Sequence, residues 1–168
     1  MKRNLFYIVV LVVLGAGSAI GYASKGGAAD AAEAGHANHF HVALTPAAVE
    51  WKPFYEGAEI AVLAGDPTKD GSPYVIRIKH RDGLRVPPHW HPFDENLTVV
   101  EGTWVMGMGE KFDLAAAQEF PEGSYLVSPK NVPHFALAKG ETIVQVHGTG
   151  PFAAYFVRPE DDVFKKAK

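Results

Sequence analysis

The chain has 168 residues, and its 16 lysines and arginines against 19 acidic residues give a formal net charge of −3 and a pI near 6.2. The length suits one domain, 47% hydrophobic residues exclude wholesale disorder, and the acidic balance disfavours nucleic acid as the main partner. Because cysteine is absent, disulfides, thiol nucleophiles and cysteine-bound metals are excluded. Any metal must therefore be held by nitrogen and oxygen, and eight histidines are available for that role.

Residues 1–23 have the pattern of a secretory signal peptide. A basic start, an apolar run over 5–14 and small residues near position 23 predict cleavage after Ala23, which would change the net charge to −5 (14 basic against 19 acidic residues). The ten-residue run is too short to cross a bilayer core of about 30 Å. Its extension over 5–22 has 18 residues, so an uncleaved membrane tether is the alternative. Both interpretations predict an exported protein, periplasmic or secreted.

An Ala- and Gly-rich segment over 24–39 predicts a flexible linker, because it has hardly any large apolar side chain to bury. His36, His39 and His41 lie at its end. A His-rich tract can bind metal, but no carboxylate stands here at ligand spacing. We therefore interpret these three histidines as solvated linker that leads into the first strand.

The body of the chain, over 40–162, predicts a single all-β domain, followed by a C-terminal tail at 163–168. Turn signals recur every eight to twelve residues, and the runs between them are rich in β-branched and aromatic residues, a pattern typical of a β-sandwich or barrel. Two short segments, 46–50 and 113–118, have a helical character. The clearest expected strands cover residues 60–63, 74–78, 96–100, 124–127, 142–146 and 155–157.

The strongest functional motif lies between Gly83 and Gly102. On a strand, His89 and His91 project to the same face, because side chains alternate with a period of two. After a kink at Pro92, Glu95 can return a carboxylate to the same point. A nitrogen-rich site with one carboxylate suits a divalent transition metal such as iron, manganese, nickel, copper or zinc.

A second segment begins at Gly123 and continues through Pro129 to His134, which follows a Pro-rich turn at the start of another strand. Together, the two segments resemble the cupin superfamily. The first matches the family motif G-x5-H-x-H-x3-E-x6-G at every position, and the second resembles G-x5-P-x-G-x2-H-x3-N. It departs from that motif at Asn131, which tolerates a left-handed turn, and at Ala138, where the family residue is not a usual ligand.

The resemblance covers roughly residues 42–159 and implies a small jelly-roll barrel, a homodimer and one divalent transition metal. Carried over by position, it implies that His89, His91, Glu95 and His134 hold the metal. In an octahedral ion these four ligands would leave two positions open for water, substrate or dioxygen.

Several other side chains are candidates for the surroundings of such a site. His147 shares one strand face with Gln145, so both either line the barrel interior as catalytic candidates or lie on the surface; the sequence leaves this open. We expect the side chains of Trp104 and Met106 either to fill the core or to form an apolar wall of a substrate pocket.

Two phenylalanines, Phe93 and Phe135, flank the expected ligands and are candidates to narrow the entrance of the pocket. His80 stands between Lys79 and Arg81, so we expect it at the surface. Trp90 is expected to point away from His89 and His91.

These features predict a metal-dependent protein that acts on a small organic molecule, most simply a dioxygenase-type oxidoreductase. Two alternatives stay open: a non-catalytic module that binds a metal or small ligand, and a Lewis-acid isomerase or lyase. A sugar-phosphate substrate is disfavoured, because only Arg85 lies near the expected ligands in the sequence. The fold cannot choose among them, since one fold hosts many activities.

Overall fold

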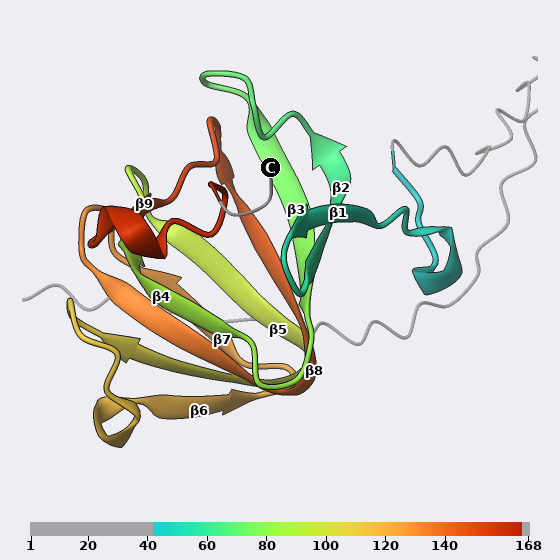
Figure 1. Ribbon diagram of the computed structural model, residues 1–168. Coiled ribbons are helices and arrows are strands. Elements are labelled where there is room, and N and C mark those ends of the chain that lie inside the picture. Colours follow the sequence, from blue (N-terminus) through green and yellow to red (C-terminus); the bar gives the residue numbers. More distant parts are fainter. Residues whose placement is uncertain (1–41, 166–168) are drawn as a thin grey trace, which may run out of the picture. The chain divides into compact units, whose positions relative to one another are not determined.

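Short strands dominate the computed structural model, which describes residues 42–165 (Figure 1). The predicted signal peptide, the linker with its histidines up to His41, and residues 166–168 lie outside the described residues. The strands are β1 (Lys52–Tyr55), β2 (Ala58–Gly65), β3 (Pro73–His80), β4 (Arg85–Trp90), β5 (Glu95–Met108), β6 (Gln118–Pro121), β7 (Tyr125–Ser128), β8 (His134–Thr149) and β9 (Tyr155–Phe156). The described residues also form three single-turn 3₁₀ helices: η1 (Pro46–Ala48) before β1, η2 (Leu114–Ala116) between β5 and β6, and η3 (Pro159–Asp161) after β9. The all-β prediction is confirmed, and the two segments expected to be helical each form one turn.

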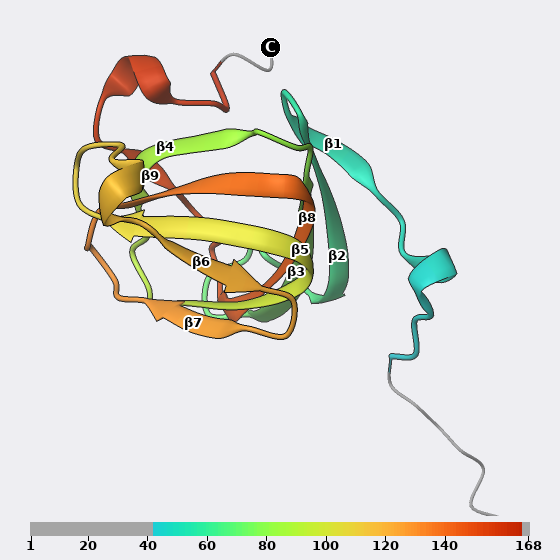
Figure 2. The same cartoon turned by 90° about the horizontal axis from the view of Figure 1, so that it is seen from below.

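Two long strands, β5 and β8, each contribute to both walls of a curled sheet. The first half of β5 pairs with the second half of β8, which also pairs with β3, and β7 extends this wall beyond β5. The second half of β5 pairs with the first half of β8, which also pairs with β4, and β6 extends that wall. Figure 2 shows β4, β8, β5 and β6 following one another across the second wall. This arrangement is the expected jelly-roll type of barrel.

The bend of β5 is built around Gly102. Its φ of +78° lies in the left-handed region, and a Cβ here would collide with the Glu141 carbonyl. The pairing with β8 shifts register on both sides of Glu101. As a result, the odd-numbered Val99 faces the interior before the bend, and the even-numbered Trp104 faces it after the bend.

Alternation along the strands explains the core. In β3, even-numbered positions are buried and odd-numbered ones are partly exposed, and in the second half of β8, Val144 and Val146 are fully buried between partly exposed neighbours. These inward side chains form one apolar cluster that surrounds the barrel interior.

The C-terminal segment closes one side of that interior. After β9 and η3, Val163 and Phe164 pack against the core, and the Phe164 ring lies 5.1 Å from the Phe54 ring, centroid to centroid. The tail expected from residue 163 thus begins with two side chains that belong to the packed structure. Within residues 42–165, no helix has the length and apolar character needed to cross a membrane.

Candidate metal centre and cavity

The first two histidines of the motif share a direction because side chains alternate along the chain, and an irregularity in β4 turns that direction into the barrel interior. The pairing of β4 with β8 shifts register between Val86 and His89, in the stretch that contains two consecutive prolines, which have no N–H for a sheet. Beyond this shift, His89 and His91 both turn into the barrel interior, where they are 7% and 5% exposed. Trp90, between them, stacks on Tyr155 with ring centroids 4.5 Å apart and does not line the cavity.

The third histidine, His134, comes from β8, the strand paired with β4. Asn131 adopts a φ of +61°, in the left-handed region that asparagine tolerates, and its N–H donates to the His91 carbonyl at 2.8 Å. This bond ties the turn before β8 to the segment that carries the first two histidines. His134, the first residue of β8, pairs with His89 across the sheet.

Backbone carbonyls orient all three imidazole rings. The Nδ1–H groups of His89, His91 and His134 donate to the carbonyls of Pro87, Ala153 and Val132, at 2.7, 2.7 and 3.1 Å. Because a carbonyl only accepts, each Nδ1 must carry the proton, so a neutral ring presents an unprotonated Nε2. The three histidines offer ligand atoms that all lie within 4.8 Å of one another. We call His89, His91 and His134 the histidine cluster.

The interior keeps the rings of His89 and His134 neutral. Burial lowers the pKa of His89 well below its ordinary value of 6.5, and the neighbouring rings of His134 and His91 act in the same direction. Burial also lowers the pKa of His134, against the opposing effect of the Glu95 carboxylate. At neutral pH both rings therefore have a free lone pair, as metal ligation requires.

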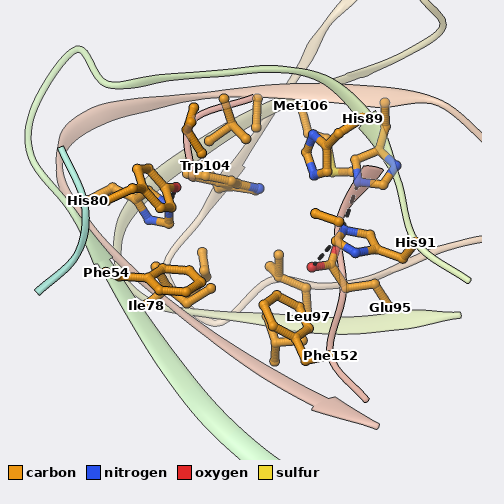
Figure 3. Close-up of a pocket in the computed structure, with 18 of the residues that line it drawn as sticks. Phe54, Ile78, His80, His89, His91, Glu95, Leu97, Trp104, Met106 and Phe152 are labelled. Atoms are coloured by element: carbon orange, nitrogen blue, oxygen red, sulfur yellow. Dashed lines mark hydrogen bonds and ion pairs between the residues drawn. The ribbon is translucent and has the colours of Figure 1, made fainter. Parts of the chain in front are cut away.

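Glu95, the first residue of β5, brings its carboxylate to the same point. Its Oε1 lies 3.4 Å from His91 Nε2, and its Oε2 lies 3.7 Å from His134 Nε2. The Ser128 hydroxyl donates to Oε2 at 3.3 Å. The structure thus brings together the four side chains that the sequence motifs single out (Figure 3).

The donor set fits a metal ion. Nε2 of His91 and Nε2 of His134 are buried, and neither has a hydrogen-bond partner among the described residues. Unpaired buried polar atoms are rare and costly, and lone pairs that face one another beside a carboxylate attract a cation. Histidine ligands whose other ring nitrogen donates to a carbonyl are the usual arrangement in metal sites. Three histidines here can hold a metal ion, and imidazole with carboxylate suits a first-row divalent metal.

The histidine cluster lies at one end of a cavity of about 50 Å³ in the barrel interior. Its walls are largely aliphatic and aromatic, and the described residues that form them include no lysine or arginine. The lining side chains are those of Phe54, Tyr55, Ile78, His80, Val86, His89, His91, Glu95, Leu97, Trp104, Met106, His134, Ala136, Val144, Val146, Phe152, Ala154, Phe156, Val163 and Phe164.

Of the four residues expected in a substrate pocket, two line this cavity and two do not. Trp104 and Met106 face it. Phe135 is buried on the other face of β8, because it alternates with His134, and its ring packs 4.9 Å from that of Phe112. Phe93 is 44% exposed and lines a separate small hollow next to His91.

Both catalytic candidates on β8 lie on its outer face. Gln145 and His147 alternate with Val144 and Val146, which face inward. The Arg77 Nε–H donates to Gln145 Oε1 at 3.1 Å, and the His147 ring stacks on Tyr125 with centroids 6.5 Å apart. The sequence left open whether these two residues line the barrel interior or lie on the surface. In the structure they lie on the surface side of the sheet, so neither residue reaches the cavity.

The expectation for His80 is wrong: the residue is 2% exposed and lines the cavity. Its charged neighbours suggested a surface position. His80 is, however, separated by an even number of positions from the buried Ile76 and Ile78 on the same strand, and this alternation indicates an inward side chain. Its Nε2 forms a 2.9 Å hydrogen bond with the hydroxyl of Tyr55, a residue that no sequence pattern singled out. Burial lowers the pKa of His80 to about 3.

Comparison with known proteins agrees with this architecture. Residues 39–153 match the model of the ChrR cupin-like domain family. No curated protein sequence matches the chain.

Among solved structures, the polyketide cyclase RemF from Streptomyces resistomycificus has a TM-score of 0.58 at 15% identity, over 73% of this chain and 89% of that one. An RmlC-like cupin from Shewanella frigidimarina has a TM-score of 0.53 at 16% identity, over 66% and 91%. A mutant salicylate 1,2-dioxygenase from Pseudoaminobacter salicylatoxidans in complex with gentisate has a TM-score of 0.50 at 15% identity, over 61% of this chain and 30% of that one. At these identities the likeness concerns the fold.

Proposed function

The chain belongs to the ChrR cupin-like domain family, and we propose that it is a metal-dependent oxidoreductase of the dioxygenase type that acts on a small organic molecule. The observation that carries the proposal is the convergence of three buried histidines, whose Nε2 atoms point at one another, beside a carboxylate at the end of an apolar cavity. His89, His91, Glu95 and His134 would hold one divalent ion. A redox-active ion bound there would supply oxygen chemistry through coordination positions that the protein leaves open.

The protein's own part is to orient the ligands and exclude water. Three backbone carbonyls fix the imidazole rings, and the Ser128 hydroxyl holds the carboxylate of Glu95. The aromatic rings of Phe152 and Phe156 lie against the histidine cluster, with centroids 5.7 Å from His91 and 5.5 Å from His89. These rings keep the surroundings of the site apolar, which favours a substrate of low polarity.

Chemistry that depends on a separate acid or base is less well supported. Apart from the proposed ligands, the titratable groups among the described lining residues are His80 and Tyr55. With a pKa of about 3, His80 is a poor base at neutral pH, and burial raises the pKa of Tyr55, so its hydroxyl keeps its proton. This argues against a Lewis-acid isomerase or lyase. Among the described lining residues there is no lysine or arginine to bind a phosphate, so we do not propose a sugar-phosphate substrate.

The test is dioxygen uptake by the iron(II)-loaded protein with a panel of small carbonyl, phenolic and thiol compounds. We expect substrate-dependent uptake with at least one compound, and His147→Ala, on the outer face, should retain it. Absence of uptake with iron, manganese, nickel and copper, in protein that binds these metals, would contradict the oxidoreductase and favour a non-catalytic binding module.

We also propose that the protein is exported through residues 1–23, on the basis of the basic start and apolar run of that segment. Mass spectrometry of the native protein tests this. A mature chain that begins at Ser24 supports cleavage, an intact chain in the membrane fraction supports the tether over 5–22, and an intact chain in the cytoplasm contradicts export.

A further inference from the structure

The end of the cavity away from the histidine cluster has a polar group that the proposed chemistry does not use. Trp104 is 5% exposed, and its indole Nε1–H has no hydrogen-bond partner among the residues that the structure describes. In Figure 3 the indole nitrogen points into the cavity, toward the side where His89 and His91 lie. A donor in this position is available to whatever fills the cavity.

The indole ring is held firmly. The imidazole of His80 packs against it with ring centroids 4.7 Å apart, and His80 is itself fixed by its hydrogen bond to Tyr55. A donor on a ring packed in this way is preorganised, so little entropy is lost when an acceptor binds to it. Trp104 Nε1 therefore has the properties of a recognition group.

We propose that Trp104 determines ligand specificity: its indole N–H donates to a neutral oxygen acceptor at the far end of a small, mostly apolar ligand whose near end lies at the histidine cluster. The inference rests on the proposed function for the near end of the ligand. The acceptor is a carbonyl, ether or hydroxyl oxygen, and the body of the ligand contacts aliphatic walls such as Leu97, Val144 and Val146.

The charge of the surroundings selects a neutral far end. Among residues 42–165 no lysine or arginine lines the cavity, so these residues offer no counter-ion to an anionic group there. The Tyr55 hydroxyl is paired with His80 Nε2, and two buried nitrogens at this end, Trp104 Nε1 and His80 Nδ1, have no hydrogen-bond partner among the described residues. Of these two, the indole N–H is a donor in every protonation state.

A ligand that lacks the acceptor would be rejected, because it would displace water and leave the N–H unpaired in an apolar interior. Sites built to hydrogen-bond a ligand discriminate strongly against analogues that lack the partner group. The structure thus predicts a preference for ligands with an oxygen acceptor over analogues of the same shape without one. A tryptophan that only filled space would not produce this preference.

The first experiment compares pairs of acids with the same shape on the zinc-loaded protein by calorimetry: 4-oxopentanoate against 4-methylpentanoate, and 5-oxohexanoate against 5-methylhexanoate. The carboxylate serves as the metal-binding end, and only the oxo compounds carry the acceptor. We expect at least one oxo acid to bind about tenfold more tightly than its methyl counterpart. Trp104→Phe should reduce this preference to less than about twofold, with unchanged affinity for the methyl acids. Trp90→Phe, outside the cavity, should keep it.

Equal binding within both pairs, or a preference that survives in Trp104→Phe, would overturn the proposal. A second measurement needs neither the metal nor a folded Trp104 variant. The chain has three tryptophans, and Trp51→Phe and Trp90→Phe identify by elimination the indole N–H signal of Trp104 in ¹H–¹⁵N spectra. In metal-free protein, 2-butanone should shift this signal and leave those of Trp51 and Trp90 in place.

The two measurements separate this inference from the proposed function. A Trp104 shift in protein that fails to bind zinc would contradict the metal site and support the recognition role. Zinc binding without any Trp104 response to 2-butanone or to the oxo acids would do the reverse.

Discussion

Buried histidines lie at both ends of the barrel cavity, and they are held in different ways. In the histidine cluster, each Nδ1–H donates to a backbone carbonyl and leaves Nε2 directed at the other rings. At the far end, His80 bonds through Nε2 to the side chain of Tyr55 and packs against Trp104. Burial lowers the pKa of His80, as it does for His89 and His134, so a neutral imidazole is common to both ends.

Burial alone does not make a histidine a candidate metal ligand. Low pKa values and low exposure describe both ends equally, so neither property discriminates between them. The distinguishing properties are the backbone anchor, which fixes the ring, and the convergence of the remaining nitrogens beside a carboxylate. His80 has neither, and its ring instead supports an aromatic neighbour.

The largest expected effect is at the histidine cluster. His91→Ala with His134→Ala removes two of the proposed ligands, so a protein that otherwise retains about one divalent metal per chain should retain essentially none. Elemental analysis after dialysis measures this, with His80→Gln as the matched control for loss of a buried histidine. Full metal retention by the double variant, or loss in His80→Gln, would remove the distinction between the two ends.

The second effect concerns stability against acid. In the unfolded chain, His80 takes up a proton as the pH falls through 6.5, whereas in the folded protein its pKa is about 3. The unfolded state therefore binds more protons between these values, and the free energy of unfolding should fall with decreasing pH by about 1.4 kcal/mol per pH unit.

Denaturation of metal-free protein at pH 7 and pH 4.5 tests this effect against His80→Gln, which keeps a hydrogen-bonding side chain but does not titrate there. The native protein should lose about 2 to 3 kcal/mol more than the variant over this interval. Equal losses would show that His80 is already protonated or accessible in the folded state.

A smaller effect is expected from Tyr55→Phe, which removes the hydroxyl partner of His80 and leaves a buried ring nitrogen without that bond. We expect a loss of about 1 to 3 kcal/mol in the free energy of unfolding and no change in metal content. A fall in metal content would show that the two ends of the cavity are coupled.

The smallest effect is expected from Ser128→Ala. The hydroxyl holds the Glu95 carboxylate through a long bond of 3.3 Å, so we place the loss of metal affinity at about tenfold, the lower end for such supporting residues. Competition with a chelator of known affinity measures it. Unchanged affinity would show that Glu95 is positioned by its strand alone.

Much of this arrangement could be predicted from sequence. The spacing of His89, His91 and Glu95, with His134 after a proline-rich turn, identified the four side chains that the structure brings together. Turn spacing identified the all-β class, because short strands and regular turns each have a characteristic residue composition over a few consecutive positions.

The parts that failed depend on contacts between distant residues. A register shift before His89 and another around Glu101 change which parity faces inward, and neither can be read from one strand alone. Phe135 was expected beside His134 on the basis of proximity in sequence, although alternation puts the two on opposite faces. The partner of His80 is Tyr55, 25 positions away, so no local pattern could reveal it.

The sharing of β5 and β8 between both walls has a consequence for cooperativity. Neither wall can detach while the other keeps its hydrogen bonds, because each long strand would have to break in the middle. Amide hydrogens in the two halves of β5 and β8 should therefore exchange with similar free energies of opening. Glu95 and His134 begin these strands, so these two side chains should leave the site only when the barrel itself unfolds, and not by fraying of a loop.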